Sequence, residues 1–110
     1  MKMKLFAQAG EGAWADTPEG NRRRIILHTD ELMLVEFVFE KDAIGAPHAH
    51  PHVQASYIAA GAFEVTIDGK VDTLRAGDSF IVPSNLVHGV RALEAGTLID
   101  SFTPHRADFV

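Results

Sequence analysis

Metal-binding side chains gather in two parts of the sequence. His48, His50 and His52 fall within five residues, Gln54 follows, and His88 stands much further along the chain. Side chains two residues apart on a β-strand share a face, which would place His48 and His50 about 6.6 Å apart. Imidazole is the commonest neutral metal ligand. We therefore expect a metal site that Gln54 and His88 complete; the alternative is a loop with solvated histidines.

The predicted ligand set indicates the chemistry that the site supports. Neutral imidazoles and a neutral amide leave the charge of a divalent ion, about +2, uncancelled, whereas a glutamate in place of Gln54 would remove one unit. Such a site attracts an anionic substrate and polarises its oxygens as a Lewis acid. It supports a high oxidation state less well, which favours an isomerase, lyase or hydrolase over an oxygenase. Nickel, zinc, manganese and iron all suit these ligands. The alternative is that Gln54 does not bind the metal.

The other histidines are weaker candidates. His52 has the parity of His50 but follows Pro51, which interrupts a strand, so we expect it to face the cavity without binding metal. His28 and His105 are expected at the surface or in a structural role.

Composition excludes several classes of protein. With 110 residues, of which 46% are hydrophobic and 23% charged, residues 1–110 suit one globular domain. The net charge of -5 argues against a nucleic-acid partner. No cysteine is present, so thiolate metal sites and disulfides are excluded. No apolar run is long enough for a signal peptide or a membrane span, and we expect a cytoplasmic protein without a membrane partner.

Short alternating apolar runs separated by Gly and Pro turns predict an all-β fold. Residues 1–20 are expected to form an N-terminal arm that holds at most one short strand and is docked by Trp14. An Asp68-Gly69 pair between two alternating runs is a strong hairpin signal. The pattern predicts a small closed or two-sheet β-barrel without helices. The expected strands are residues 22–29, 32–39, 54–59, 62–67, 70–74, 79–82, 90–93 and 97–102.

Three consecutive arginines begin the first of these strands. Charged residues often protect the edge of a sheet, so Arg22, Arg23 and Arg24 are expected mainly on a solvated face. The alternative is that one of them attracts an anionic ligand. Adjacent residues face opposite ways, so at most Arg22 and Arg24 can share a site.

The most apolar run, residues 32–39, has apolar side chains on both faces. One face is therefore expected to lie against a second subunit, as in a homodimer. Glu36 in this run requires a partner such as an arginine, with a catalytic carboxylate as the alternative. Tyr57 is expected to be a partly buried core residue or to hydrogen-bond the substrate.

Residues 45–61 (GAPHAHPHVQASYIAAG) and residues 77–88 (GDSFIVPSNLVH) carry a family resemblance. In this order they resemble the two motifs of the cupin superfamily, which implies a double-stranded β-helix, or jelly roll. By this resemblance, the metal ligands are His48, His50, Gln54 and His88. Gln54 stands where most cupins have glutamate, and Asn85 stands where the second motif usually has glycine.

The C-terminal stretch, residues 100–109 (DSFTPHRADF), narrows the resemblance. It is similar to the end of the KdgF-type pectin-degradation proteins, a small cupin group. In that group the metal ligands are three histidines and one glutamine, so Gln54 becomes a match. The group's catalytic residues correspond to Asp100, Phe102 and Arg106. Further similarity to this group lies in residues 30–33, 39–45, 48–54, 76–80 and 87–89.

Strand parity is compatible with these roles. Asp100 and Phe102 are two residues apart, so one strand would present both on the same face. Pro104 then ends the strand, and Arg106 can turn back over the mouth of the barrel. The alternative is a strand-end aspartate, a core phenylalanine and a surface arginine.

The resemblance implies ring opening of 4,5-unsaturated monouronates, the end products of pectin and alginate lyases, to the linear 4-deoxy-5-keto uronate. This activity requires a divalent metal, a small anionic sugar as partner and no organic cofactor. One alternative is another metal enzyme, such as a dioxygenase, which would consume oxygen, or an organic-acid lyase. A second is a sugar-binding module without catalysis, although such cupins are usually fused to a DNA-binding domain.

Overall fold

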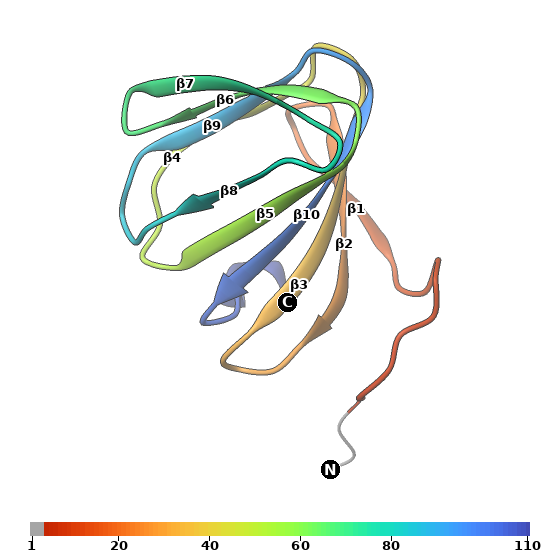
Figure 1. The fold of residues 1–110 in the computed structure, drawn as a ribbon. Coiled ribbons are helices and arrows are strands. Elements are labelled where there is room, and N and C mark those ends of the chain that lie inside the picture. Colours follow the sequence, from red (N-terminus) through yellow and green to blue (C-terminus); the bar gives the residue numbers. More distant parts are fainter. Residues whose placement is uncertain (1–3) are drawn as a thin grey trace.

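The computed structural model describes residues 4–110, so residues 1–3 of the expected N-terminal arm lie outside the described residues. Ten strands form two antiparallel sheets (Figure 1). The strands are β1 (Trp14–Asp16), β2 (Asn21–His28), β3 (Met33–Phe39), β4 (Ile44–His48), β5 (Val53–Ala60), β6 (Ala62–Ile67), β7 (Lys70–Arg75), β8 (Ser79–Val82), β9 (His88–Ala92) and β10 (Gly96–Thr103). A short 3-10 turn, η1 (Ala107–Phe109), follows β10. Within the described part of the chain, no helix is long and apolar enough to cross a membrane.

One sheet has six strands in the order β1-β2-β3-β10-β5-β8, and the other has four in the order β4-β9-β6-β7. Strands far apart in sequence are neighbours: β10 lies between β3 and β5, and β9 lies between β4 and β6. Both sheets curve around a common interior (Figure 1). The predicted all-β jelly roll is confirmed.

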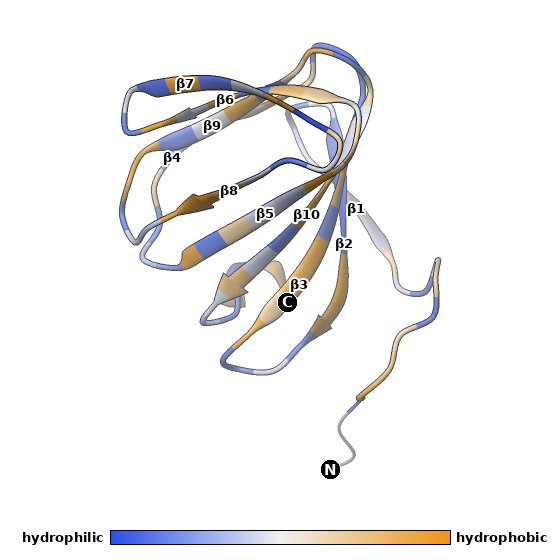
Figure 2. Cartoon of the chain, in the orientation of Figure 1, coloured by the Kyte–Doolittle hydropathy of each residue, from blue (hydrophilic) through white to orange (hydrophobic). Residues whose placement is uncertain are grey.

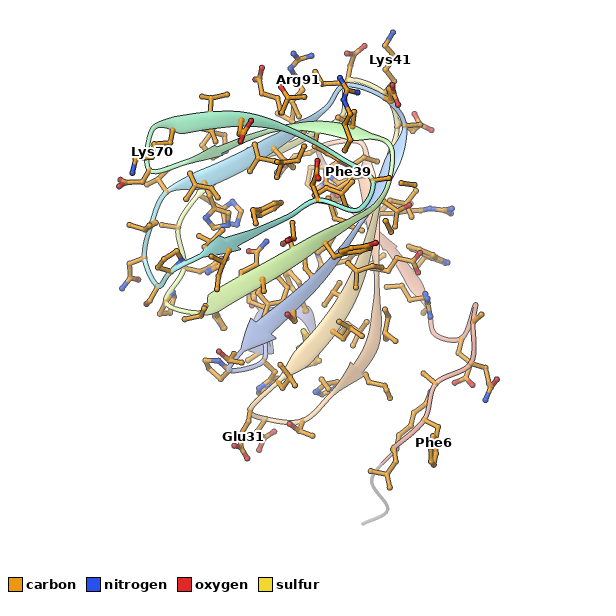
Figure 3. The ribbon with its side chains drawn as sticks, viewed as in Figure 1. Phe6, Glu31, Phe39, Lys41, Lys70 and Arg91 are labelled. Carbon is orange, nitrogen blue, oxygen red and sulfur yellow. The ribbon has the colours of Figure 1, made fainter. Side chains whose placement is uncertain are left out.

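The core lies between the two sheets. Its largest cluster joins Phe39 and Leu98 of the six-stranded sheet to Phe63 and Val65 of the other sheet. Each fully buried apolar side chain of this size contributes about 1.5–3 kcal/mol relative to exposure. Figure 3 shows Phe39 inside the molecule, whereas the labelled charged side chains of Glu31, Lys41, Lys70 and Arg91 project outward. Figure 2 shows that apolar and polar residues are mixed along the strands, as expected for sheets with one buried face.

Alternation along β5 and β10 places polar groups in this interior. Gln54 and Ser56 of β5, and Asp100 of β10, are buried with relative exposures of 6%, 3% and 5%. Tyr57 has the opposite parity and is 50% exposed on the outer face. Both sequence-based expectations for Tyr57, core residue and substrate contact, were therefore wrong, because a residue between two inward-facing neighbours must point outward.

A tight turn lies at each end of β6, and each turn contains one glycine. Asp68 and Gly69 both have positive φ, 51° and 77°, and connect β6 to β7 in the predicted two-residue hairpin. Gly61, between β5 and β6, also has positive φ, and a Cβ there would lie 2.5 Å from the carbonyl oxygen of Ala95. Only glycine fits at that position.

The N-terminal arm contributes the one short strand that the sequence allowed, β1, which pairs with β2 at the edge of the six-stranded sheet. The guanidinium of Arg22 lies 4.5 Å from the ring centroid of Trp14. Arg24 is only 7% exposed, and its Nη2 donates to Oε1 of Glu36 at 2.6 Å. The expectation that Glu36 pairs with an arginine is confirmed. Glu36 also has the parity opposite to the inward-facing Val35, so it lies outside the barrel.

Candidate functional site

Three histidines converge at one end of the barrel. His48 is the last residue of β4, His88 is the first of β9, and the two are directly paired across these strands. One ring nitrogen from each of His48, His50 and His88 lies within 4.8 Å of the others. His50 and His88 are buried, with exposures of 7% and 4%.

His50 reaches this cluster from a bend rather than from the strand that carries His48. The expectation that both lie on one strand was wrong, because β4 ends at His48. Pro51 has no backbone N–H and cannot continue a ladder, so the chain bends here before β5. Packing between the rings, and not strand periodicity, places His50 in the cluster. Its ring centroid lies 5.3 Å from that of His48 and 4.8 Å from that of His88.

Backbone carbonyls set the orientation of all three rings. The Nδ1 atom lies 2.8 Å from a carbonyl oxygen in His48, 2.9 Å in His88 and 3.1 Å in His50. A carbonyl only accepts, so each Nδ1 carries the hydrogen and each Nε2 keeps a free lone pair. The accepting carbonyls belong, in the same order, to Ala46, Leu86 and His52.

The free Nε2 atoms suit a cation. Nε2 of His88 is buried without a hydrogen-bond partner among the described residues, and Nε2 of His50 faces Oε1 of Gln54 at 3.2 Å. Two acceptors this close repel unless a proton or a metal ion lies between them. Burial lowers the pKa of His50 and of His88 below the ordinary 6.5, so both imidazoles are neutral at neutral pH. The residues present therefore fit a divalent metal ion.

Asp100 lies on β10, which is paired with β5, the strand that carries Gln54. Its Oδ2 accepts from Nε2 of Gln54 at 3.4 Å, while its Oδ1 is buried with no partner among residues 4–110. Burial raises the pKa of Asp100 to about 7, against the opposing effects of a hydrogen bond with Ser56 and the charge of Arg106. A carboxyl group with this pKa can both accept and release a proton near neutral pH. A bound dication would favour the charged form and lower this pKa.

Phe102 and Arg106 form a neighbouring wall of the cavity. Phe102 is 1% exposed, and its ring centroid lies 5.8 Å from that of His50. The Arg106 guanidinium lies 5.2 Å from the Phe102 centroid and 4.3 Å from the Phe109 centroid. Its Nε and Nη2 donate to Asp108 at 3.0 and 2.9 Å, so the forked edge of Arg106 is engaged by this carboxylate.

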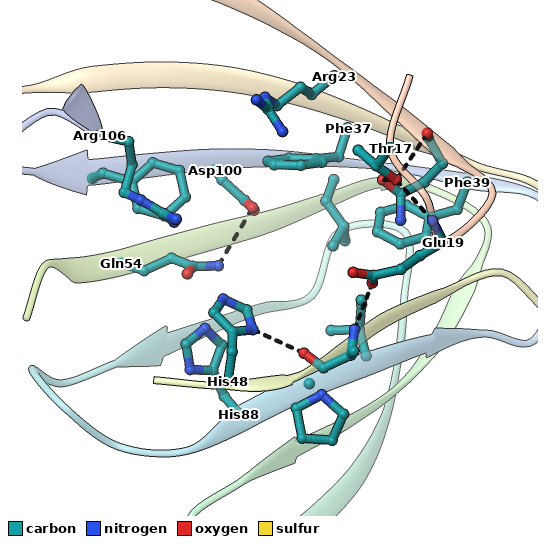
Figure 4. A pocket seen from close by; sticks show the side chains of 18 of the residues that line it. Thr17, Glu19, Arg23, Phe37, Phe39, His48, Gln54, His88, Asp100 and Arg106 are labelled. Atoms are coloured by element: carbon teal, nitrogen blue, oxygen red, sulfur yellow. Dashed lines mark hydrogen bonds between the residues drawn. The ribbon is translucent and has the colours of Figure 1, made fainter. Parts of the chain in front are cut away.

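A cavity of about 330 Å³ connects these groups (Figure 4). Six of the seven residues proposed from the sequence line it: His48, Gln54, His88, Asp100, Phe102 and Arg106. The seventh, His50, does not line the cavity, but its ring packs against those of His48 and His88. The sequence reasoning missed further lining residues, which include Glu19, Asn21, Phe37 and Phe109. Arg23 also lines the cavity, and the sequence had offered it only as one of three arginines that could attract an anionic ligand.

The remaining sequence-based candidates lie elsewhere. His52 does not line the cavity, although we expected it to face there; its ring packs 5.4 Å from that of His50. His28 and His105 stack on each other with centroids 5.6 Å apart, in agreement with a structural role.

Comparison with known proteins gives concordant results. Residues 35–102 match the family model described as "Cupin domain". The chain is 47% identical to the pectin degradation protein KdgF of Dickeya dadantii (strain 3937), over 98% of this chain and 100% of that protein. The structure of KdgF from Halomonas sp. superposes with a TM-score of 0.92 at 39% identity, covering 98% of this chain and 100% of that one. An RmlC-like cupin from Shewanella frigidimarina gives 0.94 at 41% identity, covering 97% and 96%.

Proposed function

Since the chain belongs to the cupins and, within them, to the KdgF family, we propose that it opens the ring of 4,5-unsaturated monouronates formed in pectin breakdown. The product is the linear 4-deoxy-5-keto uronate, and the same activity would serve the monomers that alginate lyases release. The observation that carries this proposal is the meeting of the histidine cluster with Asp100, Phe102 and Arg106 around one cavity.

The reaction is an isomerisation that moves one proton. The proton leaves the anomeric hydroxyl, a C=O bond forms at carbon 1, and the bond between carbon 1 and the ring oxygen breaks. Its electron pair stays on the ring oxygen, which is attached to the alkene and becomes an enolate oxygen. Protonation at carbon 4 then yields the ketone at carbon 5, so that no redox partner is required.

Asp100 is the proposed acid/base. Its Oδ1, which has no hydrogen-bond partner among residues 4–110, is available to accept the hydroxyl proton and to release it again at carbon 4. His48, His50, His88 and Gln54 would hold a divalent ion, with nickel, zinc, manganese and iron all suitable, and that ion would supply Lewis-acid polarisation of the substrate oxygens.

Phe102 and Arg106 are proposed to position the sugar. Phe102 offers a rigid wall next to His50, which excludes water from the reacting face. Arg106 is held by Asp108 and stacked on two aromatic rings, so its remaining N–H groups are preorganised to donate to a substrate oxygen.

The direct test is a chelator-controlled assay. The protein is loaded with each metal in turn and mixed with 4,5-unsaturated monouronate, and loss of the ultraviolet absorbance of the conjugated alkene is followed. Because ring opening also occurs spontaneously, acceleration over a no-enzyme control that EDTA abolishes is the expected result. No acceleration with any of the four metals would refute this function and redirect attention to oxygen consumption and to sugar binding.

We further propose a homodimer formed through the outer face of the six-stranded sheet. Tyr57 and Ile81 on the paired strands β5 and β8 are 50% and 61% exposed. Leu34 and Ile99 extend the same apolar surface across β3 and β10. A second copy would cover these side chains from water.

A further inference from the structure

Arg23 enters the cavity from β2, a strand that carries none of the residues considered so far for metal or catalysis. It is paired with Phe37 of β3 in the sheet register, and both residues line the cavity. Its neighbours Arg22 and Arg24 have the opposite parity and lie against Trp14 on the outside. Figure 4 shows Arg23 across the cavity from His48 and His88.

The guanidinium of Arg23 differs from those of Arg24 and Arg106 in having no anionic partner among the described residues. Among the described residues, none forms a side-chain hydrogen bond or an ion pair with this guanidinium, which lies over the ring of Phe109, 4.0 Å from the centroid. The guanidinium of Arg24 is engaged by Glu36, and that of Arg106 by Asp108. Arg23 therefore presents an uncompensated positive charge and a free donor fork to the cavity.

The two acidic side chains that line the same cavity, Glu19 and Asp100, do not neutralise the charge of Arg23. Glu19 Oε2 accepts from the backbone N–H of Ala46 at 2.7 Å, at the edge of β4. Asp100 is hydrogen-bonded to Gln54. Neither carboxylate pairs with Arg23. A half-buried guanidinium is stabilised by an anionic partner, so an anionic ligand in the cavity could take that place.

We propose that Arg23 binds the carboxylate of the substrate and makes the site selective for uronates over neutral sugars. This inference rests on the proposed function and assigns a role in it. Carboxylate and guanidinium match as a bidentate pair, and Phe109 holds the guanidinium plane in place by stacking. The sugar ring is thereby placed between Arg23 and the histidine cluster, with its reacting oxygens toward Asp100. Arg106, whose fork is occupied by Asp108, is left to contact a hydroxyl group.

The first test compares kinetic constants of Arg23→Gln, Arg23→Lys and Arg22→Gln. Arg22→Gln removes the same charge from the adjacent, outward-facing position and is the matched control. Loss of the clamp should raise KM by about 10- to 100-fold in Arg23→Gln, with a smaller change in kcat, because the carboxylate carries its full charge in the ground state as well as in the transition state. Arg23→Lys should recover part of the loss, since it restores charge without the fork. An unchanged KM in Arg23→Gln would overturn the inference.

The second test separates this inference from the proposed reaction. Binding of D-galacturonate and of D-galactose to metal-loaded protein is measured by calorimetry, since the two sugars differ in the carboxylate. Wild type and Arg22→Gln should prefer the acid, and Arg23→Gln should lose that preference while keeping its metal affinity and thermal stability. If Arg23 serves only to hold Phe109, stability falls and the preference remains, which refutes the proposal. Absence of the preference in wild type refutes it too, whereas absence of ring opening alone refutes only the reaction.

Discussion

The side-chain amide of Gln54 joins the histidine cluster to Asp100: its Oε1 lies 3.2 Å from Nε2 of His50, and its Nε2 lies 3.4 Å from Oδ2 of Asp100. The same Nε2 donates to Ser56 Oγ at 3.0 Å, which supports this orientation of the amide. A glutamate at this position would have no N–H to donate and would place a second carboxylate against Asp100. The neutral amide can therefore offer its oxygen to a metal ion and donate an N–H to the buried Asp100 at the same time.

Substitution Gln54→Glu should separate metal binding from catalysis. An anionic ligand should bind a divalent ion at least as tightly as the amide does, whereas the like charge next to Asp100 should raise the pKa of that carboxyl. We expect ring opening to slow by at least about tenfold because the base is held protonated. Metal titration calorimetry and the absorbance assay on the same variant test this. Tight metal binding together with wild-type activity would show that the amide is dispensable.

Asp100→Asn should abolish proton transfer without removing the metal. The amide keeps the shape of the carboxyl but cannot accept the hydroxyl proton, so activity should fall by about 10²–10⁴-fold. Metal content, measured by elemental analysis, should match wild type. Full activity in a metal-loaded Asp100→Asn protein would eliminate Asp100 as the acid/base.

The buried carboxyl of Asp100 should also leave a signature in the stability of the metal-free protein. Its folded pKa is about 7 against an ordinary 3.8, so between these values the folded state holds a proton that the unfolded chain has released. The free energy of unfolding should therefore fall as pH rises, by about 1.4 kcal/mol per pH unit from this group, and level off above the folded pKa.

The contribution of Asp100 to the pH dependence of stability can be isolated with Asp100→Asn, whose side chain does not titrate. Urea unfolding in EDTA is measured from about pH 4.5 to about pH 7.5 for wild type and Asp100→Asn, and the difference between the two slopes is taken. The stability of Asp100→Asn relative to wild type should increase toward higher pH. Parallel curves would mean that the carboxyl is not desolvated as the structure indicates.

The ion pair between Arg24 and Glu36 should matter for stability and not for activity. Arg24→Met removes the charge that compensates Glu36, whose side chain is only 23% exposed, and should lower the free energy of unfolding by about 1–3 kcal/mol. Arg91→Met is the matched control, because Arg91 is 45% exposed with longer ion pairs. The control should change stability by less than about 1 kcal/mol. Equal losses of the free energy of unfolding for Arg24→Met and Arg91→Met in chemical denaturation would contradict this prediction.

The proposed dimer can be tested with two equally exposed valine or isoleucine positions. Ile81 on β8 and Val71 on β7 are both 61% exposed, but only Ile81 lies on the outer face of the six-stranded sheet. Ile81→Asp should yield a monomer by light scattering, whereas Val71→Asp should keep the wild-type mass. A monomeric wild-type protein would refute the interface.

The sequence alone determined most of the strands and much of the candidate site, although the expected strands omitted residues 44–48 and began the later one at residue 90 rather than at His88. Period-two alternation in residues 62–67 and 97–102 is a local property, and it predicted both the strands and the common face of Asp100 and Phe102. The apolar neighbours of Glu36 in the sequence predicted that this carboxylate has a partner such as an arginine, and Arg24 is that partner. Motif spacing, through the family resemblance, assigned His88 to a site 40 residues away from His48, which periodicity by itself does not specify.

Only the tertiary structure decided which side of each sheet faces the cavity and which groups meet there. Alternation along a strand requires Arg22 and Arg23 to face opposite ways. The pairing of β2 with β3 and the packing of Arg22 and Arg24 against Trp14 determine that Arg23 is the inner one. The bend at Pro51 breaks the periodicity on which the placement of His50 rested. Contacts such as Gln54 with Asp100 depend on the register of strands distant in sequence, and that register follows from packing of the whole core.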